Sequence, residues 1–115
     1  MINTEEMLSV VMPAYNEGSH IYDNLKEVSK ILSNFMKNYE IVAVNDGSAD
    51  NTKAEIERYI IEDAHVRIVS YKKNKGKGNA IKCGVLKSRG KYIAFLDADL
   101  ELNPSQLESY LRKMI

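Results

Sequence analysis

Residues Met7 to Met36 read MLSVVMPAYNEGSHIYDNLKEVSKILSNFM, and this stretch combines two different hydrophobic patterns. It begins with a short apolar run, rich in β-branched residues, that ends at Pro13, as is typical of a buried strand. Apolar residues then recur at spacings of four, three, four and three, at Ile21, Leu25, Val28, Leu32 and Phe35. Such spacing places them in one stripe on a helix from about Glu17 to Met36. The stretch therefore predicts a strand followed by a helix.

The same pattern repeats along the rest of the chain. Further strands are predicted at Tyr39–Val44, Val66–Tyr71 and Lys91–Leu96. Each is followed by a helix. The first of these helices can be capped by Asp50 or Thr52, and Thr52 with Glu55 fits a capping box. The second runs from about Asn79 to Ser88, and the third begins at Asn103-Pro104. Parallel neighbours need crossover helices, so this alternation predicts an α/β fold with a parallel sheet.

Composition limits the class of protein. The chain has 115 residues, 44% of them hydrophobic and 28% charged, which suits one domain (residues 1–115) with one core. No apolar run approaches the roughly 20 residues that cross a bilayer, and Met1 to Glu6 lacks the layout of a secretory signal. The single cysteine, Cys83, excludes an internal disulfide and a multi-thiolate metal site. A cytoplasmic location is therefore expected.

Charge is balanced overall but unevenly distributed. The 16 basic and 16 acidic residues cancel, so the total charge gives no reason to expect a nucleic-acid partner. Lys72 to Lys91, however, contains many basic residues and no acidic one. Two interpretations remain open for this segment: a solvated lysine-rich face, which charge alone favours, or a surface that helps to hold an anionic ligand.

Polar residues follow the first two predicted strands, at the end of a parallel sheet where ligands bind. Tyr15 offers a ring for a flat base, while Asn16 and Glu17 can bond ribose hydroxyls or cap the helix. After the second strand, Asp46 can accept hydrogen bonds from a nucleobase or ribose, and Gly47 allows a tight turn. Both segments are also ordinary turn chemistry, so the residues alone leave both interpretations open.

Acidic residues follow the fourth predicted strand. Asp97 and Asp99 are two apart, so in extended backbone both carboxylates point the same way and a cation between them would relieve their repulsion. Oxygen ligands suit Mg²⁺ or Mn²⁺, and Glu101 can join as a third ligand. Lys75–Ala80 lacks the spacing of a Walker A loop and the third glycine of a dinucleotide fingerprint. Its lysines and backbone amides can still assist phosphate binding at a helix start.

Four segments in series carry a family resemblance: VVMPAYNE, VNDGSADNT, NKGKGNAIKCG and GKYIAFLDADL. Together they resemble the donor-binding half of a family 2 glycosyltransferase with a GT-A fold, in the branch of the dolichol-phosphate mannose or glucose synthases. The resemblance runs from about Leu8 to Leu111. It implies a Rossmann-like parallel sheet with flanking helices in the strand order 3-2-1-4, truncated after the fourth βα unit.

The resemblance also assigns residues to a site. Those expected to bind the nucleotide sugar are Pro13, Ala14, Tyr15, Glu17, Asp46, Lys77 and Asp97. Asp99 is expected to ligate a divalent metal, Mg²⁺ or Mn²⁺. Glu101 is a second expected ligand, at a position where polyprenyl-phosphate glycosyltransferases often have glutamine. Asp97 and Asp99 are the expected catalytic residues.

The implied reaction is inverting, metal-assisted transfer of a hexose from a UDP- or GDP-sugar to a lipid-phosphate or glycan acceptor. In a longer parent protein the domain would lie at the cytoplasmic face of a membrane, and the isolated half is expected to form a homodimer over its open apolar sheet surface. Two other classes remain as alternatives. One is a non-catalytic nucleotide-binding or regulatory module, and the other is a flavodoxin-like signalling domain that binds no nucleotide.

Overall fold

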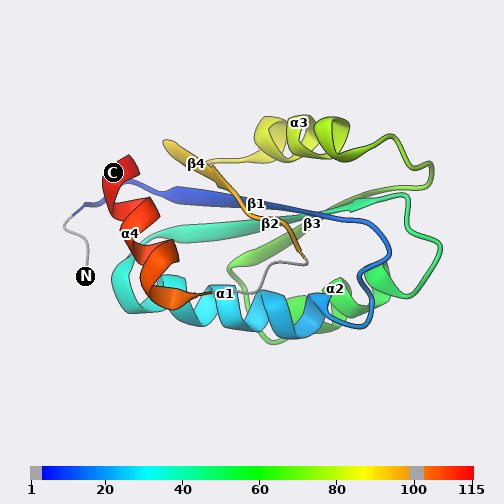
Figure 1. Ribbon diagram of the computed structural model, residues 1–115, viewed down its shortest axis with the longest axis horizontal. Coiled ribbons are helices and arrows are strands. Elements are labelled where there is room, and N and C mark those ends of the chain that lie inside the picture. Colours follow the sequence, from blue (N-terminus) through cyan, green and yellow to red (C-terminus); the bar gives the residue numbers. More distant parts are fainter. Residues whose placement is uncertain (1–3, 99–102) are drawn as a thin grey trace.

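The computed structural model describes residues 4–98 and 103–115, and its elements alternate from strand to helix (Figure 1). They are β1 (Leu8–Ala14), α1 (Ile21–Phe35), β2 (Tyr39–Asp46), α2 (Thr52–Ile60), β3 (Val66–Tyr71), α3 (Lys77–Lys87), β4 (Tyr92–Phe95) and α4 (Pro104–Met114). The alternation predicted from the sequence is confirmed. None of the helices in the described ranges combines the length and apolar character needed to cross a bilayer.

The strands form one parallel sheet in the order β3-β2-β1-β4, as predicted. β1 lies inside the sheet, where Leu8 pairs with Tyr39 of β2 on one side and with Tyr92 of β4 on the other. Since all strands run in the same direction, their carboxyl ends meet at one edge. The loops that leave β1, β2 and β4 are therefore neighbours.

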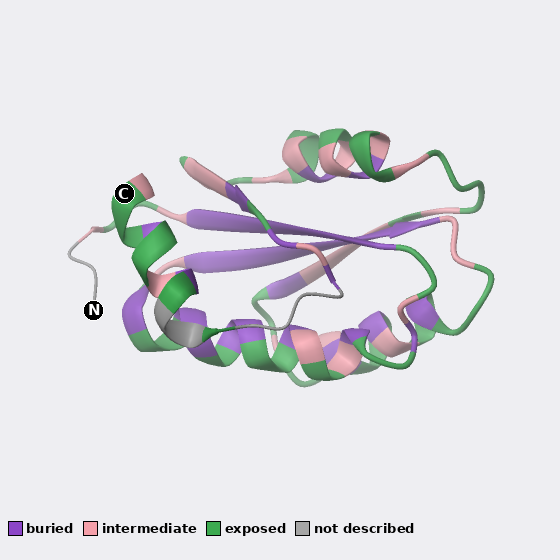
Figure 2. Cartoon of the chain, viewed as in Figure 1, coloured by how far each residue is buried: buried purple, intermediate pink, exposed green. Residues whose placement is uncertain are grey.

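The helices cover the two faces of the sheet unequally (Figures 1 and 2). Helices α1, α2 and α4 pack on one face over the larger core, which contains Val10 and Ile41 from the strands. Helix α3 alone packs on the other face, over Val11, Val42 and Val44. Neighbouring residues Val10 and Val11 enter different cores because side chains alternate along a strand.

Glycine brings α3 unusually close to the sheet. A Cβ at Gly84 would lie 2.3 Å from Cγ1 of Val11 and 3.1 Å from Cγ2 of Val44. Only a residue without a side chain fits there, which explains a glycine inside a helix despite its cost of about 1 kcal/mol in helix propensity. The close packing fixes α3, and with it the position of its first turn at the strand ends.

Two helix boundaries differ from the prediction. Helix α1 begins at Ile21 rather than near Glu17, because the backbone N–H groups of His20 and Ile21 both donate to the Glu17 carbonyl and close a separate turn. Helix α3 begins at Lys77, earlier than the predicted Asn79. The first turn of α3 therefore extends further toward the strand ends.

The capping predictions have mixed outcomes. The predicted box between Thr52 and Glu55 is wrong, since the Glu55 N–H donates to the Asn51 carbonyl at 3.0 Å and the Glu55 side chain pairs with Arg58. The Thr52 N–H donates to Asp50 Oδ1 at 3.0 Å, but the cap position of α2 is Asn51, so neither Asp50 nor Thr52 is the cap residue. Helix α4 begins at Pro104 as predicted, and Asn103 Oδ1 caps it by accepting the backbone N–H of Gln106 at 3.2 Å.

Candidate functional site

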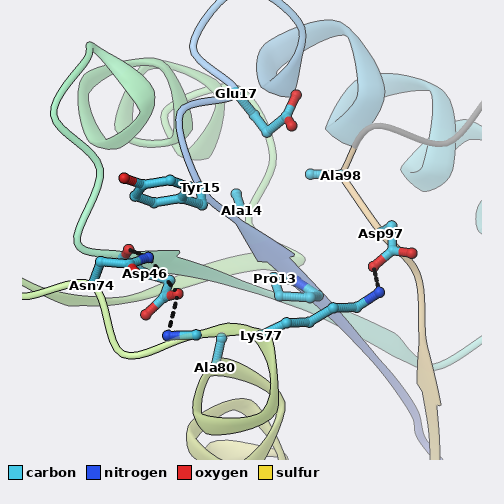
Figure 3. Close-up of a pocket in the computed structure, with 11 residues that line it drawn as sticks. Pro13, Ala14, Tyr15, Glu17, Asp46, Asn74, Lys77, Ala80, Asp97 and Ala98 are labelled. Atoms are coloured by element: carbon cyan, nitrogen blue, oxygen red, sulfur yellow. Dashed lines mark hydrogen bonds and ion pairs between the residues drawn. The ribbon is translucent and has the colours of Figure 1, made fainter.

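A pocket with a volume of about 390 Å³ opens where β1, β2 and β4 end and α3 begins (Figure 3). Pockets of this size accept small molecules. The structure brings to it every residue that the sequence nominated for nucleotide-sugar binding: Pro13, Ala14, Tyr15, Glu17, Asp46, Lys77 and Asp97. These residues come from four separate segments of the chain, which the fold brings to one edge of the sheet.

The loop after β1 presents Tyr15 to the pocket, where 49% of this residue is exposed. Asn16 next to it has a positive φ of 53°. Its backbone N–H donates to Ser48 Oγ at 3.0 Å, and its Oδ1 accepts the N–H of Ala49 at 2.8 Å. Asn16 thus ties the loop after β1 to the loop after β2 and does not cap α1, whose cap position is His20.

A second pair of bonds joins the loop after β1 to the start of α2 and the residues just before it. The backbone N–H of Glu17 donates to Thr52 Oγ1 at 2.9 Å, and that of Gly18 donates to Asp50 Oδ2 at 3.0 Å. Burial alone would raise the pKa of Asp50, but the hydrogen bonds from Thr52 and Gly18 outweigh it and lower that pKa. Asp50 therefore stays ionised at neutral pH and holds the loop that carries Tyr15.

Asp46, at the end of β2, is buried with 3% exposure and accepts several hydrogen bonds from the segment between β3 and α3. Its Oδ1 accepts the hydroxyl of Tyr71 at 2.6 Å and the backbone N–H of Lys75 at 2.9 Å. Its Oδ2 accepts the amide Nδ2 of Asn74 at 2.9 Å and the backbone N–H of Gly76 at 3.0 Å. Both carboxylate oxygens are therefore engaged in shaping the entry to α3.

Tyr71 and Gly47 both support the hydrogen bonds that Asp46 accepts. Burial, together with the hydrogen bond to Asp46, raises the pKa of Tyr71 to about 12, so its hydroxyl remains a donor at neutral pH. Gly47 has a φ of 60°, and a Cβ there would lie 2.2 Å from the backbone nitrogen of Asn74. Glycine alone lets the two loops approach this closely.

Lys77 and Asp97 face each other across the pocket (Figure 3). Lys77 Nζ lies 2.5 Å from Asp97 Oδ1, and the two side chains are 60% and 38% exposed. An exposed ion pair of this kind contributes little to stability, so both charges remain open to a ligand. The first turn of α3 adds the partial positive charge of a helix N-terminus on the Lys77 side. One wall of the pocket is therefore suited to an anion.

The metal prediction is only partly covered by the structure. The predicted ligands Asp99 and Glu101 lie outside the described residues. In the ranges that are described, no three His, Cys, Asp or Glu side chains converge as a metal site. Asp97 does present a carboxylate to the pocket, and this is the donor type that Mg²⁺ and Mn²⁺ prefer. Among the described residues, the Asp97 carboxylate thus fits the role of one ligand of a divalent cation.

Of the other lining residues, Gly76 and Ala80 lie in the Lys75–Ala80 segment that was expected to assist phosphate binding, whereas the sequence did not single out Asn74 and Ala98. Asn74 matters most, since its Nδ2 donates to both the carboxylate and the backbone carbonyl of Asp46. It lies in a polar loop where no periodicity distinguishes one residue from the next. A signal was present only in its position just before the Lys75–Gly78 segment.

The chain matches known proteins along most of its length. The family model for glycosyl transferase family 2 matches residues 9–115. The dolichyl-phosphate beta-glucosyltransferase of Dictyostelium discoideum is 40% identical over 99 residues, which cover 80% of this chain and 30% of that protein.

Solved structures agree in fold. A mannosyltransferase from Pyrobaculum calidifontis, solved with GDP-Man and Mn²⁺, has a TM-score of 0.81 at 21% identity, over 96% of this chain and 32% of its own. The glucosyl-3-phosphoglycerate synthase of Mycobacterium tuberculosis, solved with Mn²⁺, uridine diphosphate and phosphoglyceric acid, has a TM-score of 0.70 at 25% identity, over 90% of this chain and 37% of its own.

These matches confirm the predicted family and the GT-A fold class. The chain spans about a third of the length of the proteins it matches. Since the family model covers residues 9–115, nearly the whole sequence, the chain belongs to glycosyl transferase family 2.

Proposed function

We propose that this chain binds a nucleoside-diphosphate sugar in the pocket at the strand ends, as the donor-binding part of an inverting glycosyltransferase. One observation carries the proposal: Tyr15, Asp46, Lys77 and Asp97, from four different segments, surround one pocket of about 390 Å³. Family membership supports the class of reaction. Because the chain spans about a third of its relatives, donor binding is proposed for the chain and sugar transfer for the whole protein.

The nucleoside would occupy the side of the pocket formed by the loops after β1 and β2. The half-exposed ring of Tyr15 offers an apolar face on which a flat base can stack. Pro13 and Ala14 are buried at the end of β1 and form the floor, with Glu17 at the rim. The main role of Asp46 would be to hold the loop between β3 and α3, because both of its carboxylate oxygens accept hydrogen bonds from that loop.

The diphosphate would lie against the first turn of α3. Lys77 offers an ammonium group there, and the N-terminus of the helix offers partial positive charge. A divalent cation, Mg²⁺ or Mn²⁺, with Asp99 and Glu101 as its proposed ligands, would supply further positive charge. Lys77 would leave Asp97 to meet the diphosphate, and Asp97 would then be free to contact the ribose or the metal. Stabilising the departing nucleoside diphosphate in this way favours transfer.

The proposed acceptor is a lipid phosphate. Relatives of this chain include a protein named as a dolichyl-phosphate beta-glucosyltransferase. An oxygen of such a phosphate is already anionic, so it would attack the anomeric carbon from the face opposite the leaving diphosphate without a general base. The new bond joins that oxygen to the sugar, and the bond from the sugar to the nucleoside diphosphate breaks. This acceptor would place the whole protein at the cytoplasmic face of a membrane.

A homodimer is a further proposal, based on the face of the sheet that α3 leaves partly open. Ile93 of β4 packs against the small core under α3, while Phe95, two residues further on, is 47% exposed. A second copy that covered this end of β4 would remove apolar surface from water. Sedimentation of the chain with and without the substitution Phe95→Ser would test the association.

Calorimetric titration with UDP-glucose and GDP-mannose, each with and without Mn²⁺, tests donor binding. The expected result is metal-dependent binding of one of them, weakened about tenfold by Lys77→Met because an ammonium near the diphosphate is lost. The matched control is Lys82→Met, on the outer side of the same helix, which should bind as the parent does. Asp99→Asn should weaken the metal-dependent part and leave the fold intact. A folded sample that binds neither donor would contradict the proposal.

A further inference from the structure

Exposed basic side chains are concentrated in the segment that runs from the end of β3 to the start of β4. Six exposed side chains from the β3–α3 loop, α3 and the α3–β4 connection form what we call the basic face: Lys72, Lys73, Lys82, Lys87, Arg89 and Lys91. The sequence between the first and last of these residues contains no aspartate or glutamate. Within the described ranges none of the six forms an ion pair, unlike nearby Lys77, which pairs with Asp97.

The helix that carries the centre of the basic face has an uncovered outer side. Helix α3 packs alone on its face of the sheet (Figures 1 and 2). Ala80 and Gly84 are buried against the sheet, so Lys82 and Leu86 lie on the opposite side of the helix, four residues apart. Leu86 is 73% exposed. A large apolar side chain thus projects from the middle of a cationic surface.

We propose that the basic face docks this domain on an anionic lipid bilayer. Lysine and arginine clusters on one side of a helix bind acidic headgroups, and an exposed leucine among them can enter the boundary between headgroups and acyl chains. A nucleic acid fits less well, because single strands are held by aromatic side chains on which bases stack, and Lys72 to Lys91 contains no aromatic residue.

The docking surface and the pocket share one helix. Lys77, the first residue of α3, lines the pocket, while Lys82 and Leu86 lie further along the same helix on its outer side. A bilayer against that side would hold the pocket close to the membrane surface. The inference rests on the proposed function, since a lipid-phosphate acceptor has its reactive phosphate at that surface.

Vesicle binding of the 115-residue chain tests the inference. One arm uses vesicles of phosphatidylcholine alone, and the other adds about 30% phosphatidylserine to supply negative charge. The variant Lys82→Glu/Lys87→Glu/Arg89→Glu reverses the basic face. The control Lys26→Glu/Lys30→Glu/Lys53→Glu makes the same charge change at exposed positions on α1 and α2. Circular dichroism of both variants checks that they fold.

The chain is expected to bind the phosphatidylserine vesicles and not the neutral ones, and to release them as salt is raised. The basic-face variant should bind at least about 30-fold more weakly, since each cation at an anionic surface contributes severalfold to affinity, and the control should stay within about threefold. Equal binding to neutral vesicles, equal loss in the control, or tighter binding to a single-stranded RNA oligonucleotide would overturn the inference.

Donor binding measured without vesicles separates this inference from the proposed function. The basic-face variant should bind the nucleotide sugar as the parent chain does, because none of its substituted residues lines the pocket. Vesicle binding without donor binding would overturn the proposed function alone. Donor binding without vesicle binding would overturn the docking surface alone.

Discussion

Asp46 holds Gly76: the backbone N–H at the cap position of α3 donates to Oδ2 of the aspartate at 3.0 Å. The Lys75 N–H donates to the other oxygen of the same carboxylate. The end of β2 therefore fixes the point at which α3 begins, and Lys77 is the next residue along the chain. Since the wall of the pocket proposed to bind the diphosphate starts at Lys77, the position of that wall depends on a buried carboxylate that need not touch the ligand.

Asp46→Asn should destabilise the protein and also weaken donor binding. The amide keeps one oxygen but turns its NH₂ toward groups that are themselves donors, so one or two buried N–H groups lose their acceptor. We expect the free energy of unfolding to fall by about 2–3 kcal/mol. Urea unfolding measures this change. Asp97→Asn is the matched control, because the Asp97 side chain forms an exposed ion pair with Lys77 and its loss should change stability by less than about 0.5 kcal/mol. An equal loss in both variants would contradict the role given to Asp46.

Tyr71→Phe tests the same hydrogen-bond group from the other side. The substitution removes the hydroxyl that donates to Asp46 at 2.6 Å and leaves the ring in place. The expected loss is about 1 kcal/mol in the free energy of unfolding. Ultraviolet titration of the two proteins should also differ, because the parent has a tyrosine with a pKa of about 12 that the variant lacks. If the titrations superimpose above pH ~11, Tyr71 does not have the environment described.

Gly84→Ala tests the packing of α3 on the sheet. Its Cβ would lie 2.3 Å from Cγ1 of Val11, so the helix must shift outward, and overpacking of this kind costs about 1–3 kcal/mol. Gly78→Ala is the control in the same helix, since a Cβ there meets nothing within 4 Å. It should be neutral or stabilise by up to about 1 kcal/mol through helix propensity. Thermal unfolding of the two variants should therefore shift in opposite directions or by clearly different amounts. A neutral Gly84→Ala would show that the contact is not tight.

Asp63 should contribute to stability in a pH-dependent way. Burial alone would raise its pKa, but hydrogen bonds from Ser29, the backbone N–H of His65 and Tyr59 outweigh this and lower the pKa from 3.8 to about 2. A lowered pKa stabilises the folded state above the pKa of the unfolded chain, and this contribution disappears as pH falls from about 4 through 2. The shift corresponds to about 2 kcal/mol for a side chain that is 12% exposed.

Urea unfolding of Asp63→Asn between pH 7 and pH 2 measures that contribution. At pH 7 the variant should be less stable by about 2 kcal/mol, and the gap should close as the medium becomes acidic. Asp23→Asn makes the same chemical change at an exposed position in the first turn of α1 and should cost no more than about 1 kcal/mol. A gap between Asp63→Asn and the parent that stays constant down to pH 2 would contradict the assignment.

Much of the fold could be predicted from the sequence because local patterns carry it. The apolar run before Pro13 and the stripe from Ile21 to Phe35 predicted β1 and α1, and the repeated alternation predicted a parallel sheet. Polar residues placed after strands also predicted where the pocket would form, since parallel strands end at one edge. The strand order β3-β2-β1-β4 came instead from the family resemblance.

The details that the sequence did not predict depend on contacts between distant segments. Asp46 and Asn74 are 28 residues apart, and no local pattern reveals that the Asp46 carboxylate holds the loop that contains Asn74. Helix α1 starts at Ile21 because the N–H groups of His20 and Ile21 both donate to the Glu17 carbonyl, in a turn whose first residues are held by Thr52 and Asp50. The box between Thr52 and Glu55 failed for a similar reason, since Thr52 Oγ1 accepts the backbone N–H of Glu17, 35 residues earlier in the chain.

The most direct test of the account is an NMR titration of the ¹⁵N-labelled chain with UDP-glucose or GDP-mannose in the presence of Mg²⁺. We predict that the amide signals which move belong to three segments, around Tyr15, from Asp46 to Gly47, and from Asn74 to Lys77, together with Asp97. Signals of α4 and of the opposite ends of the strands should stay in place. Shifts confined to those distant regions, or no shifts at saturating ligand in a folded sample, would contradict the claim that this pocket binds the sugar donor.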